Sequence, residues 1–287
     1  MTVRTDEERD LDPRAVSART LDLPSIPAVA LQALQATKAT NASGRQIQAV
    51  IARDQALSAR ILRIVNSAKY GLKGEVATIA HAVAILGMDT LRCILMAAAA
   101  QQVLQAGVAR GQDLTAKLLS DHSWGAAIAS RIISRGIRFE NHEEAFLCGL
   151  MHDMGKLVLQ KNFPERYLNI ISEAYRGAAS FHEAEMQLFG FSHEEVGSLL
   201  AQKWNFPPQL CTAIGYHHNP ASAPNHQRLA SIISLADSAM IRLEVGIRKN
   251  RNLELAKEPA ADSLKLDKSA LDELLLEIQA SLTKMPC

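Results

Sequence analysis

Apolar residues recur at helical spacing along most of this chain, and that periodicity constrains the fold more than any other feature. In one early segment, Leu57, Ile61, Ile64 and Val65 follow the i, i+4, i+7 spacing of a buried helix face. Asp54, just before this segment, is a residue type that caps helix starts. No segment shows the alternation of apolar and polar residues that marks a half-buried strand. The sequence therefore predicts an all-α protein, a multi-helix bundle.

The composition supports this prediction and excludes several classes of protein. Aromatic residues make up only 5% of the chain, while Ala, Leu and Ile abound, which favours helices over sheets. The formal net charge of +1 lacks the basic excess of nucleic-acid-binding proteins, so no nucleic acid partner is expected. The start is too acidic for a signal peptide, and the longest apolar run, residues 93–100, is far below the roughly 20 residues of a membrane span. We therefore expect a cytoplasmic protein that has no membrane partner.

Changes in composition divide the chain into four parts. They are a charged arm (1–20), an N-terminal helical lobe (21–110), a second helical lobe (111–245), and a polar linker followed by an amphipathic helix (246–287). The polar stretch 246–266 predicts a loop, after which Asp267 would cap the terminal helix. The apolar stripe of that helix either packs on the body of the protein or forms a homodimer contact.

Histidines and aspartates of the second lobe are the candidates for chemistry. His152 and Asp153 stand side by side at the end of an apolar helix, where burying both is costly unless something compensates them, as a metal ion would. Further candidates stand on other predicted helices: His122, His193, His217, His218 and Asp237. Imidazole and carboxylate ligands suit Fe, Mn, Zn or Co better than Ca, and seven ligands suit two ions that share a carboxylate. A lone buried histidine is more often a hydrogen-bonded core residue, so the hypothesis requires all seven to converge in one pocket.

The order of these residues resembles the HD superfamily of metal-dependent phosphohydrolases, and more closely the HDOD proteins, its bacterial signalling branch. Residues 21–245 carry the resemblance, in the segments 23–27, 51–57, 62–68, 84–87, 146–156, 190–197 and 204–207. It implies an N-terminal helical lobe packed on an HD-type helical lobe, with one or two divalent ions. Fe or Mn are the first expectation, and Zn, Mg or Co are the alternatives.

The resemblance also implies a role for each candidate. His122, His152, Asp153 and Asp237 would hold one ion, and Asp153 would be shared with a second ion on His193, His217 and His218. Lys156 would contact a phosphate, so that Asp153 and Lys156 are the candidate catalytic residues. From the sequence, Glu185 either orients a ligand histidine or is solvated.

Two functions remain open at this point. The cyclic-di-GMP phosphodiesterases of the superfamily continue after the His-His doublet with an acidic residue and a Gly-Tyr-Pro signature, whereas Asn219 and Pro220 follow it here, so cyclic-di-GMP hydrolysis is not expected. HDOD proteins often lack recognised catalysis, which favours a signal-transduction regulator that binds signalling proteins or a small phosphorylated ligand. The complete ligand set supports the alternative, a metal-dependent phosphohydrolase acting on a nucleotide or another phosphate ester.

Overall fold

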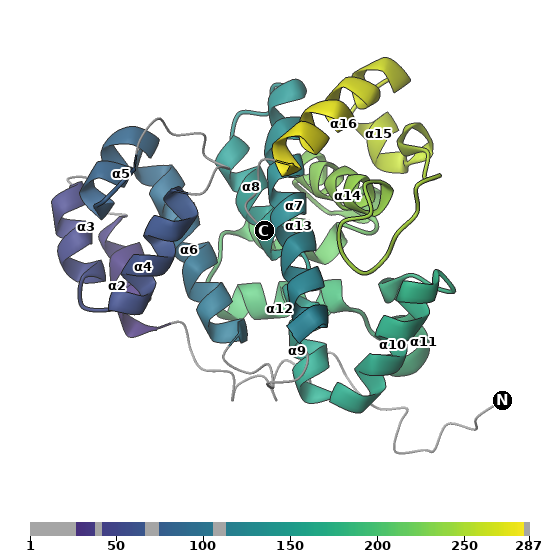
Figure 1. Ribbon diagram of the computed structural model, residues 1–287, viewed down its shortest axis with the longest axis horizontal. Coiled ribbons are helices and arrows are strands. Elements are labelled where there is room, and N and C mark those ends of the chain that lie inside the picture. Colours follow the sequence, from purple (N-terminus) through teal and green to yellow (C-terminus); the bar gives the residue numbers. More distant parts are fainter. Residues whose placement is uncertain (1–26, 38–41, 67–74, 106–112, 284–287) are drawn as a thin grey trace. The chain divides into compact units, whose positions relative to one another are not determined.

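The structure, a computed structural model, describes residues 27–37, 42–66, 75–105 and 113–283 of the chain. Its regular secondary structure is helical, with no strand among these residues, which confirms the all-α prediction (Figure 1). The predicted arm 1–20 and most of the segment 23–27 lie outside the described residues. No described helix is both long and apolar enough to cross a membrane. Contacts along the chain define two compact units, one built on Leu23–Gly107 and one on Val108–Ile278.

The unit Leu23–Gly107 is a bundle of mostly short helices. They are α2 (Ala28–Ala36), α3 (Gly44–Ile51), α4 (Gln55–Val65), α5 (Ile79–Leu86) and α6 (Met88–Gln105). The side chains of Ser43, Asp54 and Thr78 accept hydrogen bonds from the first turns of α3, α4 and α5. Each cap satisfies an N–H that has no partner inside its helix. Asp54 therefore caps α4 as predicted, and the predicted apolar stripe of this helix is buried.

The unit Val108–Ile278 holds all the candidate ligands. Its larger helices are α7 (Asp113–Gly136), α8 (His142–Met151), α9 (Met154–Asn162), α10 (Pro164–Arg176), α11 (Phe181–Phe189), α12 (His193–Lys203), α13 (Pro208–Tyr216), α14 (Gln227–Arg242) and α16 (Lys268–Leu282), the last of which runs beyond the unit. Helices α7, α8 and α14 contact one another, α12 contacts α9 and α13, and α13 contacts α8 and α14. The ligand residues lie where these two groups of helices meet.

The segment 246–266 differs from the predicted loop or linker. It contains the short helices η5 (Leu255–Lys257) and α15 (Pro259–Ser263), and α15 packs on α14. Pro259 occupies the first turn of α15, where its fixed φ favours a helix and its missing N–H costs nothing. Ala260 and Ala261 are buried, so apolar contacts offset the polar composition of the segment. Asp267 accepts a hydrogen bond from the backbone N–H of Ala270, as expected of a cap at the start of α16.

Candidate metal centre

The His152-Asp153 pair lies in the connection between α8, which ends at Met151, and α9, which begins at Met154. Gly155 allows the first turn of α9 to approach the first turn of α12 closely. A Cβ atom at this position would lie 1.9 Å from the carbonyl oxygen of His193. The missing side chain therefore lets the His152-Asp153 connection come next to His193, the first residue of α12.

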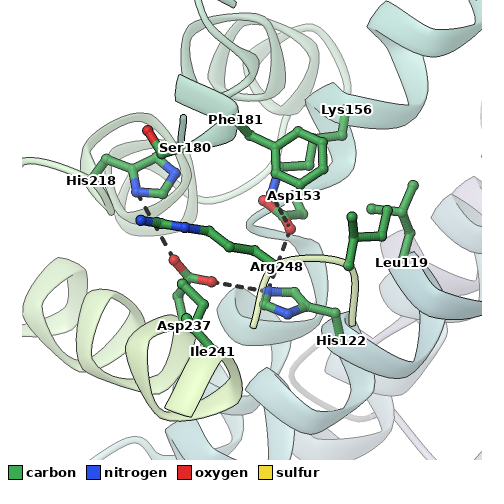
Figure 2. A pocket seen from close by; sticks show the side chains of 11 residues that line it. Leu119, His122, Asp153, Lys156, Ser180, Phe181, His218, Asp237, Ile241 and Arg248 are labelled. Carbon is green, nitrogen blue, oxygen red and sulfur yellow. Dashed lines mark hydrogen bonds and ion pairs between the residues drawn. The ribbon is translucent and has the colours of Figure 1, made fainter. Parts of the chain in front are cut away.

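The other candidate ligands come from three further elements. His122 lies on α7, Asp237 lies on α14, and the His217-His218 doublet directly follows α13. Figure 2 shows His122, Asp153, His218 and Asp237 around one pocket. The structure thus brings together side chains that are more than 100 residues apart in the sequence.

Asp153 lies between two sets of imidazoles. Its Oδ2 is 3.4 Å from Nε2 of His152 and 3.6 Å from Nε2 of His122. Its Oδ1 is 3.3 Å from Nε2 of His193 and 3.9 Å from Nε2 of His217. Because each oxygen faces a different set, one carboxylate is placed so that it could bridge two ions.

Asp237 and His218 complete the two sets. Oδ1 of Asp237 lies 3.0 Å from Nε2 of His122 and 3.9 Å from Nε2 of His152, and its Oδ2 lies 4.0 Å from Nδ1 of His218. Nε2 of His218 lies 3.2 Å from Nε2 of His193. Two triplets, His122-His152-Asp153 and His193-His217-His218, each have ligand atoms within 4.8 Å of one another and could hold a metal ion. These triplets belong to the two ligand sets that the resemblance implies.

Four of the histidines have Nδ1 beside an oxygen atom outside the centre. These contacts are His122 with the carbonyl of Val245 (3.2 Å), His152 with that of Gly149 (2.7 Å), His217 with that of Ile214 (2.8 Å), and His193 with the carboxylate of Glu185 (2.6 Å). A proton on Nδ1 leaves the lone pair of a neutral imidazole on Nε2. Second-shell acceptors of this kind are the usual partners of metal-ligating histidines.

Glu185 is one of these acceptors and is fully buried, so the solvated alternative for this residue is wrong. Its Oε2 accepts hydrogen bonds from the backbone N–H and the ring of His193, and its Oε1 accepts one from the hydroxyl of Tyr167. The carboxylate therefore holds both the ring orientation and the proton position of His193.

Several buried polar atoms of the centre lack hydrogen-bond partners in the described structure. They are Nε2 of His122, Nε2 of His152 and Oδ1 of Asp153. Although His122 is near Asp237, the two side chains lack the geometry of a hydrogen bond in this structure. A buried polar atom without a partner costs about 1–3 kcal/mol. Coordination to a divalent metal ion would satisfy all three atoms, so the residues fit such an ion.

The charges of the centre suit metal binding. Burial is the largest effect on His152 and lowers its pKa to about 3, so its imidazole is neutral. Burial raises the pKa of Asp153, but the charges of Lys156 and His193 outweigh it and keep that pKa well below its usual range. Burial lowers the pKa of His193, but Glu185 and Asp153 outweigh it and raise that pKa to about 10. An ion at His193 would therefore displace a proton.

Lys156 lies inside the centre. Its Nζ donates a hydrogen bond of 2.7 Å to Oδ2 of Asp153 and lies 4.3 Å from the ring centroid of Phe181. Only 6% of its side chain is exposed. Both candidate catalytic residues, Asp153 and Lys156, thus line the same pocket (Figure 2).

Part of the pocket wall could not be recognised from the sequence. Ser180, Phe181, Ile247 and Arg248 line it together with Leu119 and Ile241. The predicted lobe boundary at 245 separates Arg248 from the site that it lines. The one local signal was a glycine shortly after the predicted helix, Gly246, which in the structure has a φ of +106° that other residues rarely adopt.

Replacing Gly246 with alanine is expected to displace His122. The new Cβ would lie 2.9 Å from Cβ of His122 and 3.0 Å from its Nδ1, the atom that contacts Val245. We expect the protein to fold but to lose metal from the His122 side of the centre, measured as bound metal per chain. Gly177→Ala is the matched control, because Gly177 also has a positive φ (69°) but nothing lies within 4 Å of its added Cβ. Equal metal content in the two variants would contradict the prediction.

Comparison with known proteins places this geometry in a family. The HDOD domain model matches residues 23–220, so that Asp237 lies beyond the matched region. A solved HDOD domain protein of Geobacter sulfurreducens has the same fold, with a TM-score of 0.76, 23% identity, and coverage of 93% of this chain and 96% of that one. A Shewanella amazonensis SB2B protein described as a candidate phosphohydrolase has a TM-score of 0.73 and 28% identity, over 94% of this chain and 97% of that one.

Among curated proteins, an uncharacterized protein of Treponema pallidum (strain Nichols) is 27% identical over 197 residues. The similarity covers 67% of this chain but 37% of that protein, so this chain spans little more than a third of the curated relative. The family match covers well over half of the present chain, on both structural units. The chain belongs to the HDOD domain family.

Proposed function

We propose that this chain is a metal-dependent phosphohydrolase that acts on a nucleotide or another phosphate ester. The observation that carries the proposal is the convergence of the candidate ligands, with buried atoms of His122, His152 and Asp153 left without hydrogen-bond partners. The 28% identical protein described as a candidate phosphohydrolase supports it.

The residues would divide between two ions. His122, His152 and Asp237 would hold one, His193, His217 and His218 would hold the other, and Asp153 would bridge them. Fe or Mn is our first expectation for both, with Zn, Mg or Co as alternatives. When bound, such ions supply a nucleophile from water at neutral pH and neutralise phosphoryl oxygens.

The chain itself would prepare this chemistry in three ways. Lys156 places a buried positive charge beside the bridging carboxylate and inside the pocket, where it can attract a phosphoryl oxygen. Glu185 keeps His193 oriented. Phe181 covers Lys156 and limits its contact with water, which strengthens the electrostatic attraction.

One observation favours a second function, that of a signal-transduction regulator. The residues that line the pocket all lie in the unit Val108–Ile278, whereas the family match also covers the unit Leu23–Gly107. A helical unit that contributes nothing to the described site is suited to binding a signalling partner. In this role the centre would bind a small phosphorylated ligand without turning it over.

Metal analysis of the full chain, purified without added metal, tests the first proposal. We expect one or two equivalents of Fe or Mn per chain, followed by hydrolysis of some member of a panel of nucleotides and phosphate esters, with cyclic-di-GMP left intact. Bound metal without any hydrolysis would favour the regulator. A folded protein that takes up neither Fe²⁺ nor Mn²⁺ would contradict the phosphohydrolase.

A further inference from the structure

Arg248 lines the pocket of the metal centre together with His122, Asp153 and Asp237. Figure 2 shows its side chain extended among the labelled residues that line the pocket. In the part of the chain that the structure describes, its guanidinium makes no hydrogen bond, ion pair or ring contact. Its charge acts on the exposed carboxylate of Glu183 without a hydrogen bond or ion pair between the two. A cation thus lies beside a site built for charged ligands with no hydrogen-bonded or ion-paired partner.

The other cation of the pocket is already paired. Lys156 donates a hydrogen bond to Oδ2 of Asp153 at 2.7 Å, so this cation already has a buried carboxylate beside it. Basic residues elsewhere in the same unit are also engaged, such as Arg251 with Glu244 and Lys257 with Glu254. Arg248, in contrast, lines the pocket without a hydrogen bond or ion pair to any described residue.

The backbone holds Arg248 in this place. The N–H of Val245 donates to the carbonyl of Met240, and the N–H of Asn250 donates to that of Ile241, so both ends of the loop are tied to α14. Between them, Gly246 packs on His122, and Ile247 is 3% exposed. The loop that carries Arg248 is thus fixed against the metal centre.

The lining of the pocket indicates what the guanidinium of Arg248 would bind. Apolar side chains such as Leu119 and Ile241 line it together with Asp153 and Asp237, and neither carboxylate forms an ion pair with Arg248 in the described residues. A planar guanidinium can donate two parallel hydrogen bonds to a phosphate, and this is the geometry in which arginine binds phosphoryl groups best.

We propose that Arg248 binds the phosphoryl group of the ligand, holding oxygens that face away from the metal centre. The substrate class is then a phosphate ester with an accessible phosphoryl group, whose charge is shared between the centre and one arginine. This inference rests on the proposed function, since the ions would hold the remaining phosphoryl oxygens.

Calorimetric titration of the full chain with inorganic phosphate tests this proposal, with Mn²⁺-loaded and metal-free protein side by side. In the loaded protein, Arg248→Ala is expected to weaken phosphate binding about 10- to 100-fold, the range for a hydrogen bond to a charged group. Arg248→Lys should recover only part of the loss, because an ammonium cannot form the two parallel bonds. Lys249→Ala is the matched control, since Lys249 is the next residue, is exposed and does not line the pocket.

Bound Mn²⁺ and thermal unfolding are measured for each variant, so that loss of metal or of fold is not mistaken for loss of phosphate binding. Unchanged phosphate affinity in Arg248→Ala at equal Mn²⁺ content would overturn the proposal, and so would a loaded wild-type protein that binds no phosphate. If the chain takes up neither Mn²⁺ nor Fe²⁺, the proposed function fails by itself. In that case the titrations of metal-free protein test the role of Arg248. Weaker phosphate binding by Arg248→Ala than by the wild type supports this role, and equal phosphate binding overturns it.

Discussion

Asp153→Asn is expected to empty both metal positions and to reduce hydrolysis by on the order of 10³-fold or more. The reason is the central place of Asp153, whose two oxygens face His152 on one side and His193 on the other. An amide cannot bridge two cations, because its nitrogen has no lone pair to donate. Metal content by elemental analysis and turnover of the best phosphate ester measure the effect.

The same substitution removes the partner of Lys156, which is buried with its Nζ 2.7 Å from Asp153. Removing one partner of a buried ion pair lowers the free energy of unfolding by about 3–5 kcal/mol. The double variant Asp153→Asn/Lys156→Met should recover much of this stability in urea unfolding without recovering metal. Lys156→Met alone should keep its metal. Full metal content in Asp153→Asn would show that the bridging role is wrong.

Gly155→Ala is expected to destabilise the protein by at least about 3 kcal/mol, at the upper end of overpacking effects. The added Cβ would lie 1.9 Å from the carbonyl oxygen of His193 and 2.9 Å from the backbone nitrogen of Gly197. Backbone atoms cannot rotate out of the way, so α9 and α12 would have to separate, and with them Asp153 and His193. Helix propensity acts in the opposite direction but favours alanine by only about 1 kcal/mol. The clash therefore outweighs the gain in helix propensity, and the net effect on the free energy of unfolding is destabilising.

Gly136→Ala is the control for this prediction. Gly136 is also helical, but its added Cβ would meet the end of the Leu274 side chain at 2.9 Å, and that side chain can change its rotamer. We expect its free energy of unfolding to stay within about 1 kcal/mol of the wild-type value. A Gly155→Ala protein that is as stable as the wild type and retains its metal would refute the close approach of α9 and α12.

Local patterns explain why so much of the fold could be predicted. A helix depends on contacts three or four residues apart, so the stripe from Leu57 to Val65 and the cap at Asp54 are visible in the sequence alone. The segment 246–266 was harder to predict, because its short helix α15 depends on packing against α14 rather than on its own polar composition.

The candidate site also has features that local sequence patterns indicate and features that depend on how the helices pack. The ligand types and their order could be predicted from the sequence, because imidazoles and carboxylates beside apolar helices are chemically conspicuous wherever they occur. Which atoms face one another depends on the packing of the helices. His122 contacts the carbonyl of Val245, 123 residues away, and Arg248 lines the pocket from a loop that no local pattern connects to it. Close approaches such as that of Gly155 to His193 set the register of packed helices, and the periodicity along one helix does not encode them.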